Sequence, residues 1–116
     1  MYKIMVTFKL NEGVDPDEFW KWYLETRKDF FKDRPGLRRL VINRVTKVRE
    51  DPLKIDPPIP QFWACMEAWY NSPDDLKKAA KVPSNKQAGK ELRSKISLMT
   101  THVVEEEVII GDDLFK

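Results

Sequence analysis

The chain has 116 residues, of which 41% are hydrophobic, and this is enough for one compact domain over residues 1–116. Its net charge is only +2, with acids and bases interspersed, so the sequence offers no strong electrostatic case for binding nucleic acid or an anionic membrane. The single cysteine, Cys65, excludes an internal disulfide, and with only one histidine beside it a zinc site of these ligands is not expected.

The chain opens with a strand pattern. Residues 2–10 alternate between apolar and mainly polar side chains, which predicts a half-buried strand. This opening lacks the long apolar core of a signal peptide, and no run approaches transmembrane length. We therefore expect a cytoplasmic protein without a membrane partner.

A strong helix start follows at Asp15. Asp15 can accept backbone N–H bonds as the N-cap, Pro16 suits the first helical position, and Glu18 completes a capping box. The helix is expected to run to about Asp33, because Pro35 disfavours helical geometry at the residue before it.

Arg27 projects from the centre of the apolar face of this helix. At about 100° per residue, that face comprises Phe19, Trp20, Tyr23, Leu24, Phe30 and Phe31. A charge in such a place costs on the order of several kcal/mol unless it is paired or reaches water. Arg27 is therefore expected to pair with a carboxylate or to line a wet cavity. A simpler interpretation is that its stem packs while the guanidinium reaches solvent at the edge.

Three further strands and a proline-rich loop are predicted. Residues 37–49, 61–70 and 96–110 all alternate, and the first of these runs is rich in β-branched side chains. Residues 50–60 contain four prolines, which excludes a helix or a central strand. A loop of this length is expected to close a pocket or to clasp a partner subunit.

The strand over residues 61–70 places a carboxylate between two tryptophans. Trp63, Cys65, Glu67 and Trp69 are expected on one face, with the intervening apolar residues on the other. Cys65 has no adjacent base and is interpreted as core filler. Glu67 either belongs to a site or simply meets solvent on an exposed or edge face.

A second helix start at Ser72 repeats the design of the first, with a cap, a proline and then an acid at the third helical position. This helix is expected to stop before Pro83, and a polar, basic helix over residues 85–95 should lie loosely on the surface. The two caps lie 57 residues apart, and each helix follows one strand and precedes another. The order βαββαβ predicts an α+β, ferredoxin-like fold with a four-stranded antiparallel sheet.

One face of such a sheet is left without helices. That face would carry Leu, Val, Met and Trp side chains, and these need a cover. The simplest cover is a second copy, placed sheet against sheet by two-fold symmetry. We therefore expect a homodimer, or a higher assembly built from it.

Several stretches of the chain resemble the EthD-like family of dimeric α/β-barrel proteins. They are FWKWYLETR (19–27), PGLRR (35–39), VIN (41–43), MEAWYNSP (66–73) and VVEEEV (103–108), in the family's order. The resemblance implies a homodimer whose two sheets pair as a dimeric α/β barrel, with a pocket in each subunit between helices and sheet. Related proteins include cofactor-free enzymes acting on aromatic polyketides, lactone isomerases, and degradation-pathway proteins with no assigned chemistry.

The sequence departs from the family's pattern at Arg27, where the family usually carries a histidine. An imidazole exchanges protons near neutral pH, whereas a guanidinium in effect does not. Arg27 is thus expected to hold an anionic group, such as a carboxylate or an enolate oxygen, and not to act as an acid or base.

The candidate site joins Arg27 with Glu67 and His102, and its expected walls are Tyr23, Asn43, Trp63 and Trp69. Arg27 and Glu67 could instead form a buried salt bridge with no further role. His102 is either a proton carrier or a structural residue of its strand.

No metal or cofactor is expected. Residues 105–107 are all glutamate, but in a strand the middle side chain points away from its neighbours, which argues against a metal site. The four glycines are scattered and form neither a phosphate loop nor a dinucleotide fingerprint.

Two interpretations of function stay open. In one, a small homodimer binds an aromatic or polyketide-like molecule, anionic or neutral, without turning it over. In the other, a cofactor-independent lyase, isomerase or oxygenase acts on an aromatic or lactone substrate, with Arg27 holding an anionic oxygen and His102 or Glu67 moving the proton. The placement of His102 and Glu67 relative to Arg27 separates the two. A third interpretation is an interaction module that uses residues 50–60.

Overall fold

The computed structural model describes residues 2–31, 34–47, 49, 53, 62–81 and 84–111. Within these residues the elements are β1 (Tyr2–Leu10), α1 (Pro16–Phe31), β2 (Leu37–Arg44), β3 (Ala64–Tyr70), α2 (Pro73–Ala80), α3 (Ser84–Arg93) and β4 (Ile96–Val104). The proline-rich loop predicted over residues 50–60 lies outside the described residues, apart from Leu53.

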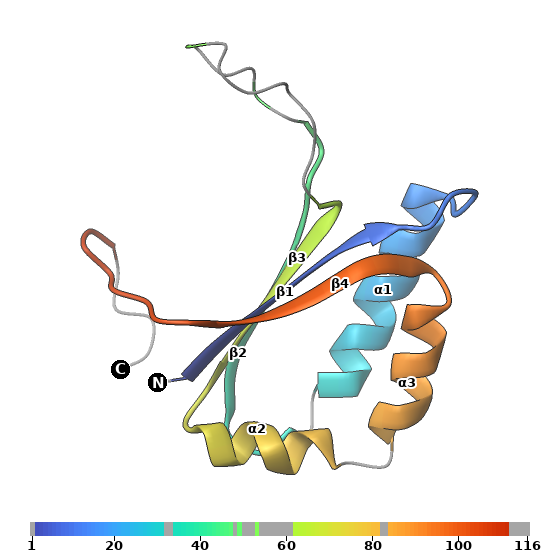
Figure 1. Cartoon of the computed structure of the whole chain (residues 1–116). Coiled ribbons are helices and arrows are strands. Elements are labelled where there is room, and N and C mark those ends of the chain that lie inside the picture. The colour runs from blue at the N-terminus through green and yellow to red at the C-terminus, as the bar shows by residue number, and fades with distance from the viewer. Residues whose placement is uncertain are drawn as a thin grey trace.

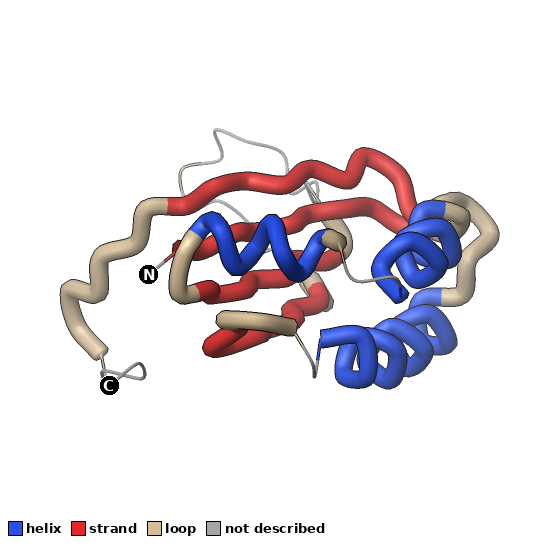
Figure 2. Tube along the Cα trace, turned by 90° about the horizontal axis from the view of Figure 1, so that it is seen from below, coloured by secondary structure: helices blue, strands red, loops and turns tan. Residues whose placement is uncertain are grey.

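The strands form one antiparallel sheet in the order β2-β3-β1-β4. Figure 1 shows α1 and α3 side by side next to the sheet and α2 across its lower end. The view in Figure 2 shows the same pairing of α1 and α3. The predicted α+β, ferredoxin-like arrangement with a four-stranded antiparallel sheet is confirmed.

Both predicted helix starts are present. The backbone N–H of Glu18 donates to Asp15 Oδ1 at 2.9 Å, and the N–H of Asp75 donates to Ser72 Oγ at 3.3 Å. Each cap satisfies a backbone donor that the first helical turn leaves without a partner. Leu24 corrects one detail of α1: it was expected on the apolar face but is 42% exposed.

Gly36 ties the turn before β2 to the start of α2. Its φ is +70°, a conformation that L side chains rarely adopt, and any Cβ there would overlap the side chain of Asp75. Arg34, from the same turn, donates through Nη1 to the carbonyl of Ala79 near the end of α2. The turn therefore contacts α2 near both of its ends.

Three strands are shorter than predicted. β2 ends at Arg44 instead of residue 49, and β3 begins at Ala64 instead of residue 61, because the pairing between these strands stops at Arg44 opposite Ala64. β4 ends at Val104 instead of residue 110, because Val104 lies opposite Lys3, near the beginning of β1. Each strand ends where its backbone no longer pairs with a neighbouring strand.

A bulge in β4 decides which side chains face the helices. Ser97 lies opposite Lys9 and Thr100 lies opposite Thr7, so two residues of β4 face the single residue Phe8. Leu98 in this bulge has φ +52°, the left-handed conformation. The uniform alternation predicted for residues 96–110 is therefore wrong: the faces exchange at Leu98, so that Met99 and Thr101 lie on the same side of the sheet as Ile96.

The core between the sheet and the helices is largely aromatic. Phe8, Phe19 and Tyr23 are buried together, with ring centroids 5.5–6.0 Å apart. Trp63 packs edge-on against Phe19 at 5.3 Å, although it was expected on the opposite face with Glu67. Trp63 precedes β3, so the alternation of that strand does not fix its direction.

Helix α3 is part of this core. Leu92 is only 8% exposed and packs in the cluster that contains Tyr23 and Phe8. The expectation that this polar, basic helix lies loosely on the surface is wrong, because one buried leucine anchors it. Across the described residues, no helix has the length and apolar character needed to cross a membrane.

Candidate functional site

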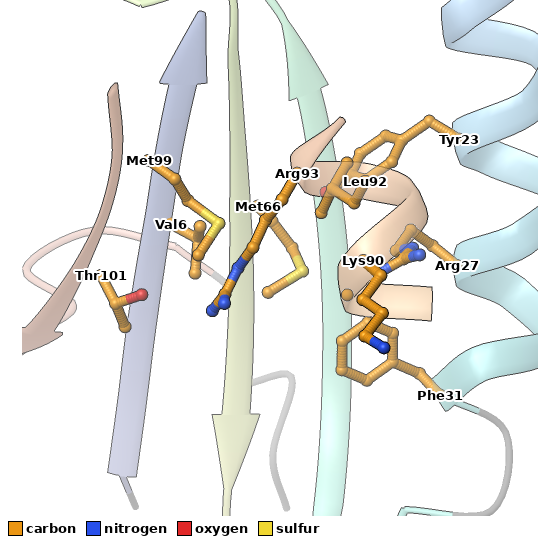
Figure 3. Close-up of a pocket in the computed structure, with 11 residues that line it drawn as sticks. Val6, Tyr23, Arg27, Phe31, Met66, Lys90, Leu92, Arg93, Met99 and Thr101 are labelled. Atoms are coloured by element: carbon orange, nitrogen blue, oxygen red, sulfur yellow. The ribbon is translucent and has the colours of Figure 1, made fainter. Parts of the chain in front are cut away.

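A pocket of about 430 Å³ lies between α1, α3 and the helix-covered face of the sheet (Figure 3). Helix α1 contributes Tyr23, Arg27 and Phe31, which are spaced four residues apart and so share one face. The strands contribute Val6, Met66, Met99 and Thr101, and α3 contributes Gly89, Lys90, Leu92 and Arg93. The walls are thus mainly apolar, with cationic groups on the helical side.

Arg27 is the buried charge of this pocket. It is only 4% exposed, and its guanidinium carbon lies 5.5 Å from the centroid of the Tyr23 ring. Burial lowers the pKa of Arg27 below its ordinary value, and Arg34 adds to this, while Tyr23 and Glu91 oppose it. An arginine keeps its charge under such a shift, so the pocket holds a buried cation at neutral pH.

Tyr23 is the hydroxyl-bearing neighbour of Arg27. Burial raises the pKa of Tyr23 to about 12, although the charge of Arg27 works in the opposite direction. The phenol therefore stays protonated at neutral pH. It can donate a hydrogen bond to a ligand oxygen but cannot serve as a general base there.

Two further cations stand on α3. Lys90 and Arg93 are exposed residues three positions apart and both line the pocket. Figure 3 shows Lys90 beside Arg27 and Phe31, and Arg93 extending from α3 toward Val6 on β1. Among the described lining residues, three are cationic and none is acidic. The lining therefore favours an anionic occupant.

The structure brings together only part of the site expected from the sequence. Tyr23 and Arg27 line the pocket, whereas Trp63 packs in the aromatic core. Asn43 lies opposite Cys65, and Glu67 and Trp69 continue the same face of β3, away from the helices. The expected pairing of Arg27 with Glu67 is wrong, because these residues lie on opposite faces of the sheet.

Glu67 instead belongs to a cluster on the helix-free face. Lys3 Nζ lies 3.1 Å from Glu67 Oε1 and 2.9 Å from Glu106 Oε1. Trp69 Nε1 donates to Glu106 Oε2 at 2.6 Å, and Lys3 Nζ lies 4.6 Å from the centroid of the Trp69 ring. Glu67, the carboxylate that lies between Trp63 and Trp69 in the sequence, is therefore an ion-pair partner of Lys3.

These contacts shift the pKa values of the cluster. Burial alone would lower the pKa of Lys3, but hydrogen bonds to Glu106 and Glu67 and their negative charges leave it above the ordinary value. Hydrogen bonds from Trp69 and Lys3 lower the pKa of Glu106, against the smaller opposing effect of burial. Both shifts stabilise the charged forms, as expected for an ion pair.

His102 is also on the helix-free face. It lies opposite Met5 on β1, and its Nδ1 is 3.1 Å from the carbonyl oxygen of Met5. Its immediate neighbour Thr101 lies opposite Val6 and lines the pocket. The bulge at Leu98 causes this exchange, so His102 does not share a cavity with Arg27.

Apart from Tyr23 and Arg27, sequence reasoning missed the residues that line the pocket, Lys90, Arg93, Met99 and Thr101 among them. The three-residue spacing of the basic residues Lys90 and Arg93 can be read from the sequence. The sequence does not show, however, that α3 packs beside the pocket; the structure shows this through the burial of Leu92. Met99 and Thr101 depend on the bulge.

The comparisons with known proteins support the fold. No family model and no curated protein match the sequence. Among solved structures, an EthD family protein from Bacillus halodurans C-125 is 22% identical over 92% of this chain and 100% of its own, with a TM-score of 0.66. SnoaB, a cofactor-independent oxygenase from Streptomyces nogalater, is 15% identical over 96% of this chain and 97% of its own, with a TM-score of 0.70.

A dimeric ferredoxin-like protein of unknown function from Thermobifida fusca YX is 11% identical over 89% of this chain and 88% of its own, with a TM-score of 0.71. At these identities the likeness concerns the fold. It confirms the ferredoxin-like architecture that the resemblance to the EthD-like family implied.

Proposed function

We propose that this chain forms a homodimer and that each subunit binds an aromatic or polyketide-like molecule with an anionic group in the pocket between α1, α3 and the sheet. The observation that carries the proposal is the buried guanidinium of Arg27 in an otherwise largely apolar cavity. A guanidinium can grip a carboxylate or enolate through two parallel hydrogen bonds, and a low dielectric strengthens that contact.

The remaining walls suit a flat apolar body. Phe31 offers an aromatic ring, and Met66 and Met99 offer flexible, polarisable side chains that adapt to irregular shapes. A volume of about 430 Å³ falls within the range of small-molecule sites, which is roughly 300–1,000 Å³. Tyr23, protonated at neutral pH, adds a hydrogen-bond donor beside Arg27.

The helix-free face supports the proposed dimer. Met5, Val41 and Val104 are only half-buried on that face, and the similar protein from Thermobifida fusca is dimeric. A second copy on this face would leave both pockets accessible, because they open on the other side of the sheet. Light scattering at micromolar concentration should give about twice the subunit mass of 13.7 kDa, and a mass near 13.7 kDa would refute the dimer.

A second candidate function is a cofactor-independent lyase, isomerase or oxygenase acting on an aromatic or lactone substrate. The fold of SnoaB favours it. Arg27 would then stabilise a developing oxyanion, and Tyr23 would donate a hydrogen bond to it. Proton transfer by His102 or Glu67 would have to occur on the other face of the sheet, away from Arg27. The geometry therefore favours binding over this chemistry.

Calorimetric titration with 2-naphthoate tests the binding proposal. We expect the Arg27→Met variant to bind at least tenfold more weakly than the wild type, because a charge-assisted contact contributes roughly 1.5–3 kcal/mol. Methionine fills much of the space that the aliphatic part of the arginine side chain occupies, and replacing a buried charge by an apolar side chain is usually tolerated. Circular dichroism should confirm that the variant is folded.

Arg44→Gln is the matched control. Arg44 pairs with Asp17 on the surface and does not line the pocket, so its loss removes the same charge without touching the site. The neutral ligand 2-acetylnaphthalene should bind wild type and Arg27→Met about equally. Equal affinity of both proteins for 2-naphthoate would contradict the proposed role of Arg27.

A further inference from the structure

We infer that Gly89 of α3 sets the size of ligand that the pocket accepts, because its missing side chain leaves room for a second fused ring against the backbone of the helix. This inference rests on the proposed function and adds the class of ligand, an aromatic acid with at least two fused rings. It comes from a glycine that neither the backbone geometry nor the packing of the described chain requires.

The backbone geometry gives no reason for a glycine at this position. Gly89 lies in the interior of α3 (Ser84–Arg93), and it does not adopt a positive φ, unlike the glycines at the turns. A glycine inside a helix is less favourable than an alanine, because it loses more backbone freedom on folding. Alanine at position 89 would therefore give the more stable helix.

The packing of the chain gives no reason either. A Cβ at Gly89 would meet no atom of the rest of the described chain within 4 Å, whereas a Cβ at Gly36 would overlap Asp75. The fold therefore has space for a side chain at position 89. Glycine is the favoured residue where a ligand must come into close contact with the backbone.

The open space beside Gly89 belongs to the pocket. Gly89 lines the pocket and precedes Leu92 by three positions, so both residues lie on one face of α3. Leu92 is only 8% exposed, and its burial turns this face toward the core. The other lining residues of α3, Lys90 and Arg93 among them, have long side chains. Gly89 is thus the place where the backbone of α3 itself forms the wall.

The position of Arg27 relates this bare wall to the ligand. Arg27 and Gly89 lie on the neighbouring helices α1 and α3 and line the same cavity, and Met66 lines it from β3 (Figures 1 and 3). A ring system whose carboxylate is held by Arg27 passes between α3 and the sheet, and its second ring lies against the backbone at Gly89. A methyl group at position 89 would occupy space that this ring needs, and overpacked contacts are unfavourable.

Calorimetric titration with benzoate and 2-naphthoate tests this inference, because the two ligands share one acid group and differ by one fused ring. Wild type should bind 2-naphthoate about tenfold more tightly than benzoate, since the second ring buries further apolar surface. Gly89→Ala should remove most of this advantage and change the affinity for benzoate by less than about twofold.

Two further variants separate the added volume from the stability of the helix. Gly89→Ser adds about as much volume as Gly89→Ala, although serine is the weaker helix former, so it should remove the advantage of 2-naphthoate to the same extent. Asp29→Ala is the matched control, because it favours helix formation in α1 at an exposed position that does not line the pocket. The advantage of 2-naphthoate should survive in this control.

Thermal unfolding at one fixed protein concentration tests the premise about the helix. Gly89→Ala should unfold about 3–6 °C above wild type, because alanine is the better helix former and meets open space. A lower unfolding temperature would show that the fold itself requires the glycine and would overturn the inference.

The outcomes separate the role of Gly89 from the proposed function. If 2-naphthoate keeps its advantage in both variants at position 89 while Arg27→Met loses affinity, the inference is overturned and the proposed function stands. A loss in Gly89→Ala but not in Gly89→Ser, or an equal loss for both ligands, would reflect helix stability and would also overturn the inference. If neither acid binds wild type, the proposed function itself fails.

Discussion

The Lys3→Met variant is expected to lose about 2 kcal/mol of unfolding free energy, because it leaves Glu67 and Glu106 without their shared cation. The loss lies below the 3–5 kcal/mol typical of fully buried pairs, since the side chains of Glu67 and Glu106 are 24% and 32% exposed. Urea denaturation at one fixed protein concentration measures it, because the proposed dimer would make apparent stability depend on concentration.

Lys9→Met is the matched control for this variant. Lys9 projects from the same face of β1, and it makes no ion pair within the part of the chain that the structure describes. Its replacement should change the unfolding free energy by less than about 0.5 kcal/mol. Adding Glu67→Gln and Glu106→Gln to Lys3→Met should restore most of the lost stability, because no unpaired charge then remains.

The same cluster predicts a dependence on pH. The pKa of Glu106 lies below its ordinary value of 4.5 in the folded chain, so its stabilisation is present above that pH and is lost as the pH falls through the lower folded value. The pKa of Lys3 lies above 10.5, so its stabilisation is present below that pH and is lost as the pH rises through the raised value.

The stability difference between wild type and Lys3→Met should therefore be greatest between about pH 5 and 10 and shrink outside that window. A difference that stays constant down to pH 3 would show that Lys3 acts through packing alone.

The Thr101→His variant is expected to bind 2-naphthoate about threefold more tightly at pH 5 than at pH 8. Thr101 lines the pocket from β4, across from Arg27, so a histidine there adds a titratable positive charge to the cavity that holds the anionic ligand. The imidazole gains a positive charge below about pH 6.5, and the added attraction appears only on the acidic side. The naphthoate carboxylate stays ionised over this range.

Thr100→His is the control, one residue away. After the bulge at Leu98, Thr100 lies opposite Thr7 on the helix-free face, so its replacement should leave the pH profile of binding unchanged. Without the bulge, Thr100 would face the pocket and Thr101 would lie on the helix-free face. A pH-dependent affinity in Thr100→His, with none in Thr101→His, would show that the register of β4 after residue 99 is wrong.

The sequence predicted the features that depend on local chemistry. The caps at Asp15 and Ser72 were recognisable because short polar side chains before a proline satisfy the first backbone donors of a helix. The position of Arg27 on the inner face of α1 followed from helical periodicity. Each of these signals lies within about one or two turns of chain.

The features that the sequence missed depend on distant residues or on backbone choices with no local signal. Leucine seldom adopts a positive φ, so nothing in the sequence marked Leu98 as the bulge that moves His102 out of the pocket. The partner of Glu67 is Lys3, which is 64 positions away in the sequence, and no local pattern relates the two residues.

The most direct test of a site organised around Arg27 observes this side chain itself. In an NMR titration of the wild-type protein with 2-naphthoate, the side-chain Nε–Hε signal of Arg27, assigned by its absence from Arg27→Met, can be followed beside that of Arg44. We predict a saturable shift of the Arg27 signal with the affinity measured by calorimetry, and no shift of the Arg44 signal. An unchanged Arg27 signal at saturating ligand would contradict a site organised around this arginine.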